Sequence, residues 1–197
     1  AGKSLEPADY ERLSDGQRDR LAAALGAFYA ALHAIPLEEA RLAGVVDIDP
    51  WLDAHTTLER AAAALPVHLL GFLHETVENY RQLTADDIVL GYFDGHGWNM
   101  AFDHEAGLLH GLFDFADAGF GSRHQDLSYS NWISPDLTLR IIDHYEAQTG
   151  LAIDRARIML CSAMLRCVEL AGAVPDGAGI AERLLAVEQW AATSMTA

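Results

Sequence analysis

The chain has 197 residues and a mass of 21.4 kDa, which corresponds to one folded domain with room for a sizeable core. Hydrophobic residues make up 51% of the sequence and only 6 residues are proline, a composition typical of a globular protein and not of a disordered or collagenous one. The 29 acidic and 13 basic residues give a formal net charge of −16, which disfavours binding to nucleic acid or anionic lipid and favours cationic partners and metal ions.

Cysteine usage and hydropathy indicate a cytoplasmic protein with no membrane partner. Cys161 and Cys167 lie six positions apart in one expected helix, so their side chains point to different faces and cannot readily form a disulfide. No apolar run approaches the roughly 20 residues that a membrane span requires. The first residues also lack the apolar stretch of a signal peptide.

The first part of the chain is predicted to be helical up to about residue 82. Ser14 and Gln17 have the spacing of a capping box, and they open a helix whose apolar residues recur every three or four positions until His33. A second helix is expected over 52–66 and a third over 67–82, separated at a proline.

The spacing of the apolar residues changes at Asp87. Residues 88–93 form a short β-type run, and 100–102 and 108–113 are two further extended segments joined by a polar turn. This pattern predicts a small central β-hairpin that is preceded by the glycine-rich loop 94–99.

The remainder of the chain is predicted to be irregular over 116–122 and then helical. Gly150 is the expected C-cap of one of the later helices, and Asp154 is the expected N-cap of the next. The expected helices are 125–132, 137–148, 155–171 and 180–192. The predicted fold is therefore of the α+β class and predominantly helical.

Polar residues gather where the predicted strands end. Asp94, His96 and Asn99 lie close together on the loop after the first strand, and Asp114 follows the last strand. Such loops often carry function because the strands fix them in space. Carboxylate and amide oxygens are the ligands that Mg²⁺ prefers, with phosphate oxygens and water completing its shell. Each residue alone could simply form a turn, but their joint order and spacing match the parts of a kinase-like phosphotransferase.

Two loop segments carry a resemblance to a known family. Residues 94–99, Asp-Gly-His-Gly-Trp-Asn, resemble the catalytic loop of the aminoglycoside phosphotransferase and choline kinase superfamily, whose pattern is His-Gly-Asp-x-His-x-x-Asn. Residues 113–121, followed by Asp126-Leu127, are similar to the metal-binding segment of that family, and the helix ending at His33 resembles the first large helix of its C-terminal lobe. The resemblance implies that residues 1–197 form the C-terminal lobe of a protein-kinase-like fold.

The resemblance also implies roles for individual residues. Asp94 and His96 would be catalytic, with Asp94 orienting the substrate hydroxyl or acting as base and His96 supporting the loop. Asn99 and Asp114 would hold Mg²⁺. Asp126 would support the catalytic loop through hydrogen bonds to its backbone.

The sequence departs from the family pattern in two ways. Tyr92-Phe93 stands where the pattern has His-Gly, which changes an architectural residue of the loop but no group that contacts metal or phosphate. The family holds ATP under an N-terminal β-rich lobe with a strand lysine, whereas Lys3 is the only lysine here and no strand precedes the first helix. We therefore expect this chain to lack the N-terminal ATP-binding lobe and to have little or no kinase activity alone. Apolar surface near 88–93 is then expected to favour self-association.

The function implied by the resemblance is transfer of the ATP γ-phosphoryl group to a hydroxyl of a small molecule, with ATP and Mg²⁺ as cofactors. The acidic balance favours a cationic acceptor, and an aminoglycoside antibiotic is the first expectation, which would make the protein a resistance enzyme. Choline, homoserine, sugar-amine and macrolide kinases are the alternatives within the superfamily. A non-catalytic binding lobe and a metal-dependent hydrolase are alternatives from other classes.

Other motifs give weaker signals. Gly2-Lys3-Ser4 has the end of a Walker phosphate loop, but the first glycine and the preceding strand are missing, and Pro7 is expected to interrupt the helix that should follow. The nine histidines form no His-x-x-x-His pair on a helix, and the two cysteines form no Cys-x-x-Cys, so no zinc site is predicted.

Overall fold

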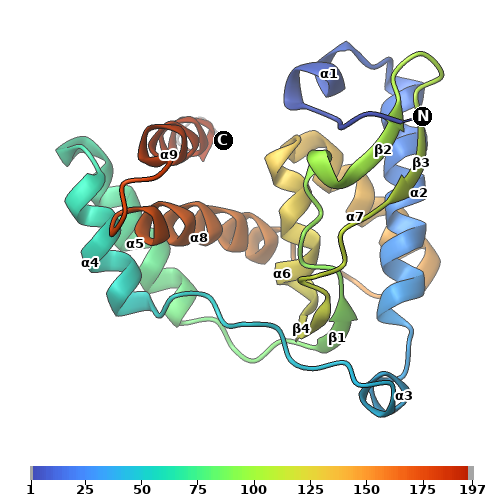
Figure 1. The fold of residues 1–197 in the computed structure, drawn as a ribbon, viewed down its shortest axis with the longest axis horizontal. Coiled ribbons are helices and arrows are strands. Elements are labelled where there is room, and N and C mark those ends of the chain that lie inside the picture. The colour runs from blue at the N-terminus through green and yellow to red at the C-terminus, as the bar shows by residue number, and fades with distance from the viewer. Residues whose placement is uncertain (1, 195–197) are drawn as a thin grey trace. The chain divides into compact units, whose positions relative to one another are not determined.

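A computed structural model describes residues 2–194 of the chain (Figure 1). These residues form two compact units. The first contains the chain up to Ile48 together with Asp86–Ile158, and the second contains Asp49–Ala85 together with the chain from Met159 onward. All five residues to which the sequence assigns a role in the site belong to the first unit.

Two long helices that lie side by side form the framework of the first unit. They are α2 (Asp15–His33) and α7 (Pro135–Thr149), and Figure 1 shows them running along one another. The predicted capping box opens α2, because the Ser14 side chain accepts from the Gln17 backbone and the Gln17 side chain accepts from the Ser14 backbone. Gly150 closes α7 in the left-handed conformation with φ 71°, as predicted.

Two pairs of short antiparallel strands lie beside these helices. The predicted hairpin is confirmed as β2 (Met100–Asp103) paired with β3 (Leu108–Leu112). The predicted strand at 88–93 is confirmed as β1 (Ile88–Gly91), and it pairs with β4 (Gly119–Ser122). The prediction of an irregular stretch over 116–122 is therefore wrong for its second half, where β4 forms a second two-stranded sheet.

Short helices complete the first unit. The predicted helix 125–132 is observed as α6 (Arg123–Ser128) followed by the 3₁₀ turn η3 (Tyr129–Trp132). The six-residue helices α1 (Pro7–Arg12) and α3 (Leu37–Leu42) were not predicted. The expectation that Pro7 would interrupt a helix is wrong, because proline in the first helical turn needs no N–H partner and here begins α1.

Most of the core of the first unit lies between α2, α7 and the hairpin. The largest fully buried side chains of this core include residues from these three elements, from α1 and from the position directly after β1: Tyr10, Leu21, Leu25, Tyr29, Tyr92, Phe102, Leu137 and Tyr145. In the apolar run 88–93, Ile88 is 50% exposed and the residues that follow it are buried. Only the first residue of that run is therefore available as apolar surface in the described structure.

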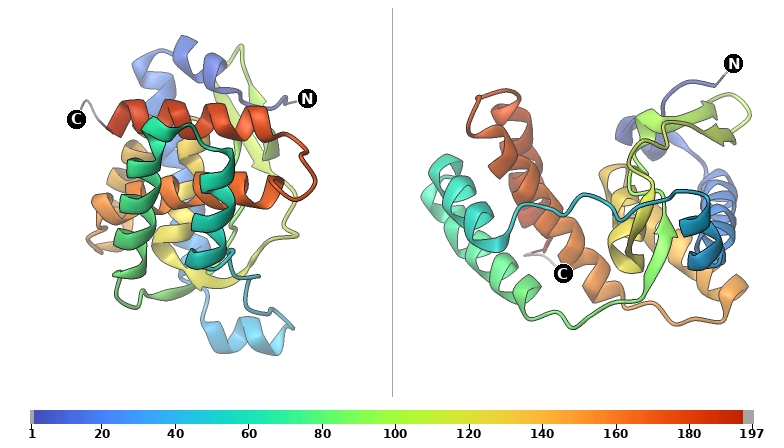
Figure 2. Two further views of the ribbon diagram at one scale, coloured as in Figure 1. Left: turned by 90° about the vertical axis from the view of Figure 1, so that its left-hand side faces the viewer. Right: turned by 60° about the horizontal axis from the view of Figure 1, so that its bottom comes forward.

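The second unit is helical. It contains α4 (Ala54–Ala64), the 3₁₀ turn η1 (Val67–Leu69), α5 (Leu70–Arg81), most of α8 (Arg155–Ala173) and α9 (Ile180–Ser194). Figure 2 shows α4 and α5 running alongside one another, with α8 and α9 crossing them. Cys161 and Cys167 are both buried and free, which confirms that they do not form a disulfide.

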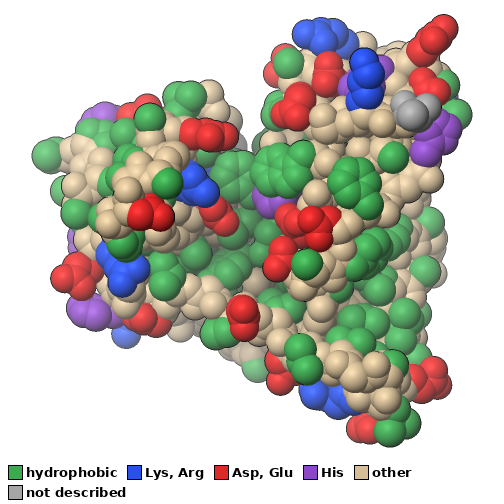
Figure 3. Space-filling view, viewed as in Figure 1, with side chains coloured by type: hydrophobic (Ala, Val, Ile, Leu, Met, Phe, Trp, Pro, Cys, Tyr) green, Lys and Arg blue, Asp and Glu red, His purple; other side chains and the backbone are tan. Residues whose placement is uncertain are grey.

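Acidic side chains are spread over the visible face of each unit in Figure 3. Among residues 2–194, no helix is both long enough and apolar enough to cross a membrane.

Candidate functional site

The loop after β1 holds the Asp94 carboxylate in a fixed orientation. Asn99 donates from Nδ2 to Oδ2 of Asp94 at 2.5 Å and to the backbone carbonyl of Asp94 at 3.2 Å. His96 places its Nε2 atom 3.3 Å from the other carboxylate oxygen, Oδ1. The Asp94 side chain keeps 19% of its surface exposed, so the carboxylate is accessible from solvent. A carboxylate oriented in this way can accept a hydrogen bond or a proton.

Aromatic rings support His96 from several sides. The indole of Trp98 stacks on the imidazole with ring centroids 4.1 Å apart and an interplanar angle of 12°. Tyr129 contacts the imidazole edge-on at 5.4 Å, and Trp132 contacts it at 5.7 Å. These contacts fix the imidazole plane beside Asp94. His96 therefore lies where the sequence placed it, within contact distance of the candidate base.

Asp126 anchors the backbone that leads into the loop. Its two carboxylate oxygens accept from the backbone N–H groups of Tyr92, at 3.0 Å, and Phe93, at 2.6 Å. Asp126 is fully buried on α6 and also contacts Nε2 of His33 at 2.9 Å. Hydrogen bonds between an ionised acceptor and buried N–H groups are stronger than neutral ones, so this contact fixes the position at which the loop leaves β1.

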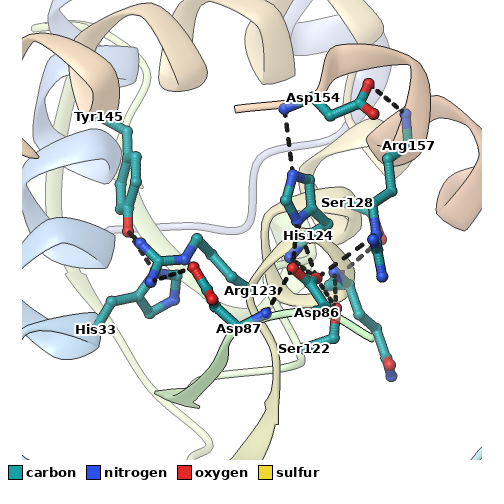
Figure 4. A network of polar contacts seen from close by, with 11 residues as sticks. His33, Asp86, Asp87, Ser122, Arg123, His124, Ser128, Tyr145, Asp154 and Arg157 are labelled. Carbon is teal, nitrogen blue, oxygen red and sulfur yellow. Dashed lines mark hydrogen bonds and ion pairs between the residues drawn. The ribbon is translucent and has the colours of Figure 1, made fainter. Parts of the chain in front are cut away.

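A chain of polar contacts extends from His33 to the edge of the first unit, as Figure 4 shows. Nδ1 of His33 lies 3.1 Å from the hydroxyl of Tyr145, and that hydroxyl accepts from Arg123 at 2.8 Å. Arg123 also pairs with Asp87 at 3.4 Å. The arrangement fits a histidine that is protonated on Nε2, because Tyr145 can then donate to Nδ1.

Phe93 has an unusual backbone conformation. Among the described residues, Phe93 with φ 55° and Asp114 with φ 59° are the non-glycine residues with positive φ. The left-handed conformation costs a residue with a β-carbon about 1–2 kcal/mol. Phe93 stands where the family pattern has glycine, and its hydrogen bond to Asp126 and its buried ring, 3% exposed, offset that cost.

The segment that carries Asp114 lies next to Asn99. The backbone N–H of Phe113 donates to the backbone carbonyl of Asn99 at 3.1 Å, and the hydroxyl of Tyr92 donates to the carbonyl of Phe113. Burial raises the pKa of Tyr92, and the negative charges of Asp94 and Asp114 raise it further. Asp114 itself is exposed, and one of its carboxylate oxygens accepts from the backbone of Ala116 at 3.4 Å.

The donor set fits a magnesium ion that is completed by phosphate oxygens. Asn99 uses its Nδ2 atom on Asp94, which leaves its amide oxygen as the atom that can act as a ligand, and Asp114 offers an exposed carboxylate. Mg²⁺ commonly takes only one or two protein oxygens and fills its remaining positions with water and phosphate. Within residues 2–194, no group of three or more His, Cys, Asp or Glu side chains could hold a metal ion.

Sequence reasoning missed several residues that support the site. His33 was noted only as the end of α2, and its buried position on Asp126 is the work of tertiary packing. A histidine among the buried residues of an amphipathic helix indicates a contact with a polar side chain elsewhere in the fold, because a buried imidazole needs a hydrogen-bonding partner. Tyr145 and Arg123 carry no comparable signal in the sequence.

A second polar cluster, centred on Asp86, fixes the start of β1 (Figure 4). The Asp86 carboxylate accepts from Nδ1 of His124 at 2.9 Å and from the hydroxyl of Ser122. Nε2 of His124 accepts from the backbone N–H of Asp154 at 3.2 Å, at the beginning of α8. Burial alone would raise the pKa of Asp86, but the hydrogen bonds from His124 and Ser122 together hold it well below the usual aspartate range. Asp154 accepts from the Arg157 backbone at 3.1 Å, which confirms it as an N-cap.

Comparisons with known proteins identify the family of this chain. Solved structures that match include a GDP complex of a variant of aminoglycoside 2′-phosphotransferase-IIIa, with a TM-score of 0.84 and 21% identity over 98% of this chain and 68% of that one. A choline/ethanolamine kinase family protein from Mesorhizobium loti matches with a TM-score of 0.61 and 12% identity, covering 96% of this chain and 66% of that one.

A macrolide 2′-phosphotransferase type I matches with a TM-score of 0.59 and 19% identity over 90% of this chain and 59% of that one. These likenesses confirm the kinase-like fold. No curated protein matches the sequence. The model of the phosphotransferase enzyme family matches residues 1–161, and the chain therefore belongs to that family.

Proposed function

We propose that this chain carries the catalytic loop and metal-binding segment of a small-molecule kinase that transfers the γ-phosphoryl group of ATP to a substrate hydroxyl. The observation that carries the proposal is the orientation of Asp94, whose carboxylate oxygens contact Asn99 and His96 on a loop anchored by Asp126. Phosphoryl transfer depends mainly on positioning and charge stabilisation, and this loop provides positioning before any substrate arrives.

In the proposed mechanism, each residue has a distinct task. Asp94 accepts the hydrogen bond of the substrate hydroxyl and takes its proton as the new O–P bond forms and the bond between the γ-phosphorus and the bridging oxygen of ATP breaks, which releases ADP. His96 and Asn99 keep the carboxylate pointed at that hydroxyl. Asn99 and Asp114 would hold Mg²⁺, which when bound offsets the negative charge of the phosphate oxygens. Asp126 keeps the loop backbone at the end of β1.

The substrate that we propose is a cationic molecule with a free hydroxyl, and an aminoglycoside is the first choice. The net charge of −16 supports this choice because it attracts a polycation. Two of the matching solved structures are described as complexes of aminoglycoside phosphotransferases with kanamycin and with gentamicin. Resistance to such antibiotics would be the biological consequence. Choline, homoserine, sugar-amine and macrolide acceptors are the alternatives within the family.

We also propose that residues outside this chain bind much of the nucleotide. Lys3 is the only lysine, and its backbone is bound to Phe102 by two hydrogen bonds of 2.8 Å. Its side chain is exposed at the start of the first unit. The chain also spans 68% of the length of the aminoglycoside 2′-phosphotransferase-IIIa variant described above. We therefore expect the 197 residues alone to show little transfer.

The test is a transfer assay on the longer protein that contains this chain, with ATP or GTP, Mg²⁺ and a panel of hydroxyl acceptors. Asp94→Asn is expected to lower kcat by about 10²- to 10⁴-fold, the range typical of a lost general base. Asp49→Asn, which changes an exposed carboxylate of the second unit, is the control and is expected to have no effect.

Unchanged transfer in Asp94→Asn would contradict the catalytic assignment. If the unaltered protein transfers phosphate to none of the acceptors, a binding lobe without catalysis is the better explanation. Phosphoester hydrolysis with Mg²⁺ and no nucleotide would instead favour a metal-dependent hydrolase.

A further inference from the structure

Tyr92 connects the two segments that carry the proposed catalytic groups. It is fully buried, and its backbone N–H is bound to Asp126 at 3.0 Å. Its side-chain hydroxyl donates to the backbone carbonyl of Phe113, the residue directly before Asp114. One residue therefore contacts both the anchor of the catalytic loop and the peptide that leads into the metal-binding segment.

Phe113 is held by hydrogen bonds on both sides of its backbone. Its N–H donates to the carbonyl of Asn99 at 3.1 Å, and its carbonyl accepts from the hydroxyl of Tyr92. These two contacts tie the peptide before Asp114 to both ends of the catalytic loop. Asp114 then has φ 59°, a conformation that needs external support in a residue with a β-carbon.

Packing alone does not account for a tyrosine at this position. The ring of Tyr92 packs against Phe28, with centroids 5.8 Å apart, and against Phe115, with centroids 4.8 Å apart. A phenylalanine would make the same ring contacts without burying a hydroxyl, which costs free energy unless the hydroxyl is hydrogen-bonded. The hydroxyl is therefore explained by its polar partners, the carbonyl of Phe113 and the side chain of Asn99.

We propose that Tyr92, which stands where the family pattern has histidine, is a positioning residue whose hydroxyl holds the Asp114 segment against the catalytic loop. The importance of this contact for catalysis rests on the proposed function, because it matters only if Asp114 acts together with Asp94 and Asn99. The hydrogen bond between Tyr92 and Phe113 does not depend on the proposed function, so it can be tested separately from metal binding.

The first measurement is amide hydrogen exchange at Phe113 by NMR. Tyr92→Phe removes only the hydroxyl, and we expect the Phe113 amide to exchange about tenfold faster, because the backbone of Phe113 loses one of the two hydrogen bonds that hold it. Tyr10→Phe is the matched control, because Tyr10 is also buried and its hydroxyl donates to Asp136 at 2.6 Å.

The second measurement is the affinity for Mn²⁺, used as a probe for Mg²⁺, by calorimetric titration. Tyr92→Phe is expected to weaken Mn²⁺ binding about fivefold or more, while Tyr10→Phe leaves it unchanged. Asp114→Asn is expected to weaken it further, because the carboxylate ligand itself is lost.

The two measurements separate the possible failures. Equal exchange at Phe113 in Tyr92→Phe and the unaltered chain would overturn the positioning role, as would equal acceleration in Tyr92→Phe and Tyr10→Phe. Mn²⁺ binding that Asp114→Asn leaves unchanged would overturn the metal assignment in the proposed function. In that case the exchange measurement still decides the role of Tyr92.

Discussion

The loop 94–99 and the Asp114 segment lie next to one another but are held in different ways. Asp126 is fully buried and fixes the start of the loop through two backbone N–H groups. Asp114 is exposed, and the hydrogen bonds that fix its segment to the loop are made by the backbone of Phe113. Both segments contain a residue with positive φ, but only Phe93 has a buried side chain to offset the cost.

This difference corresponds to the different tasks that we propose for the two carboxylates. A base must be oriented before the substrate binds, and fixed neighbours reduce the reorganisation that the reaction requires. A magnesium ligand can adjust its position to the phosphate oxygens that complete the shell of the ion. A side chain that is exposed on a fixed backbone, as at Asp114, allows this adjustment.

The largest effect is expected from Asp126→Asn. An asparagine at this position offers one acceptor oxygen where the aspartate offers two. The backbone N–H of either Tyr92 or Phe93 therefore loses its acceptor. His33 also loses its contact with a carboxylate. We expect the free energy of unfolding to fall by about 3–5 kcal/mol, measured by urea denaturation. Asp114→Asn is the control and should change it by less than about 0.5 kcal/mol. Similar losses in both variants would show that the segments do not differ.

Phe93→Gly tests whether the packing of the Phe93 ring outweighs the conformational cost of its positive φ. Glycine removes the cost of the left-handed conformation, about 1–2 kcal/mol, but it also removes a ring that is 3% exposed and that packs near Gly91 and Gly121. Loss of a buried phenyl group typically costs about 3–5 kcal/mol. We therefore expect a net loss of about 2 kcal/mol in urea denaturation. An increase in stability would mean that the strain at Phe93 outweighs its packing.

Asp86→Asn tests a carboxylate that is fixed by hydrogen bonds but lies outside the candidate site. The pKa of Asp86 is lower in the folded chain than in the unfolded one, so its stabilising contribution is present above about pH 4 and is lost as the pH falls further. We expect Asp86→Asn to cost about 2 kcal/mol at pH 7, and the difference from the unaltered chain to shrink by about 1 kcal/mol at pH 3.

The neighbouring variant Asp87→Asn is the control for this pH dependence. Asp87 has a side chain that is 78% exposed and pairs only with Arg123 at 3.4 Å. Surface pairs of this kind contribute about 0–1 kcal/mol, so a small change at pH 7 is expected. A constant difference between Asp86→Asn and the unaltered chain from pH 7 to pH 3 would contradict the low pKa of Asp86.

The sequence predicted the parts of the fold that local rules determine. The capping box at Ser14, the C-cap at Gly150 and the N-cap at Asp154 were all confirmed, because each depends on a few neighbouring residues. The hairpin β2–β3 was also predicted, from two extended runs on either side of a polar turn. The sequence further brought Asp94, His96 and Asn99 together correctly, because they lie on one short loop.

The missed features depend on long-range contacts. Strand β4 has the sequence Gly-Phe-Gly-Ser, which shows no alternation, and its glycines allow close packing. A β-carbon at Gly121 would lie 2.5 Å from the ring of Phe93. The contact of His33 with Asp126 joins residues 93 positions apart, and that of Tyr92 with Phe113 joins residues 21 apart. No local pattern records such pairs, so they became visible only in the folded chain.

The smallest effect, and the finest test of the comparison, is expected at Asp114. In Asp114→Gly, relief of the positive φ is offset by the greater conformational entropy of glycine in the unfolded chain, so the free energy of unfolding should change by less than about 0.5 kcal/mol. Asp114→Ala keeps the β-carbon and loses the side-chain contact with the Ala116 backbone, so it should be about 1 kcal/mol less stable than Asp114→Gly. Both variants lose the carboxylate, so Mn²⁺ affinity should fall equally in the two. Equal stability of the glycine and alanine variants would mean that the segment relaxes to negative φ once the carboxylate is gone. The backbone contacts of Phe113 would then be too weak to hold the Asp114 segment in its conformation.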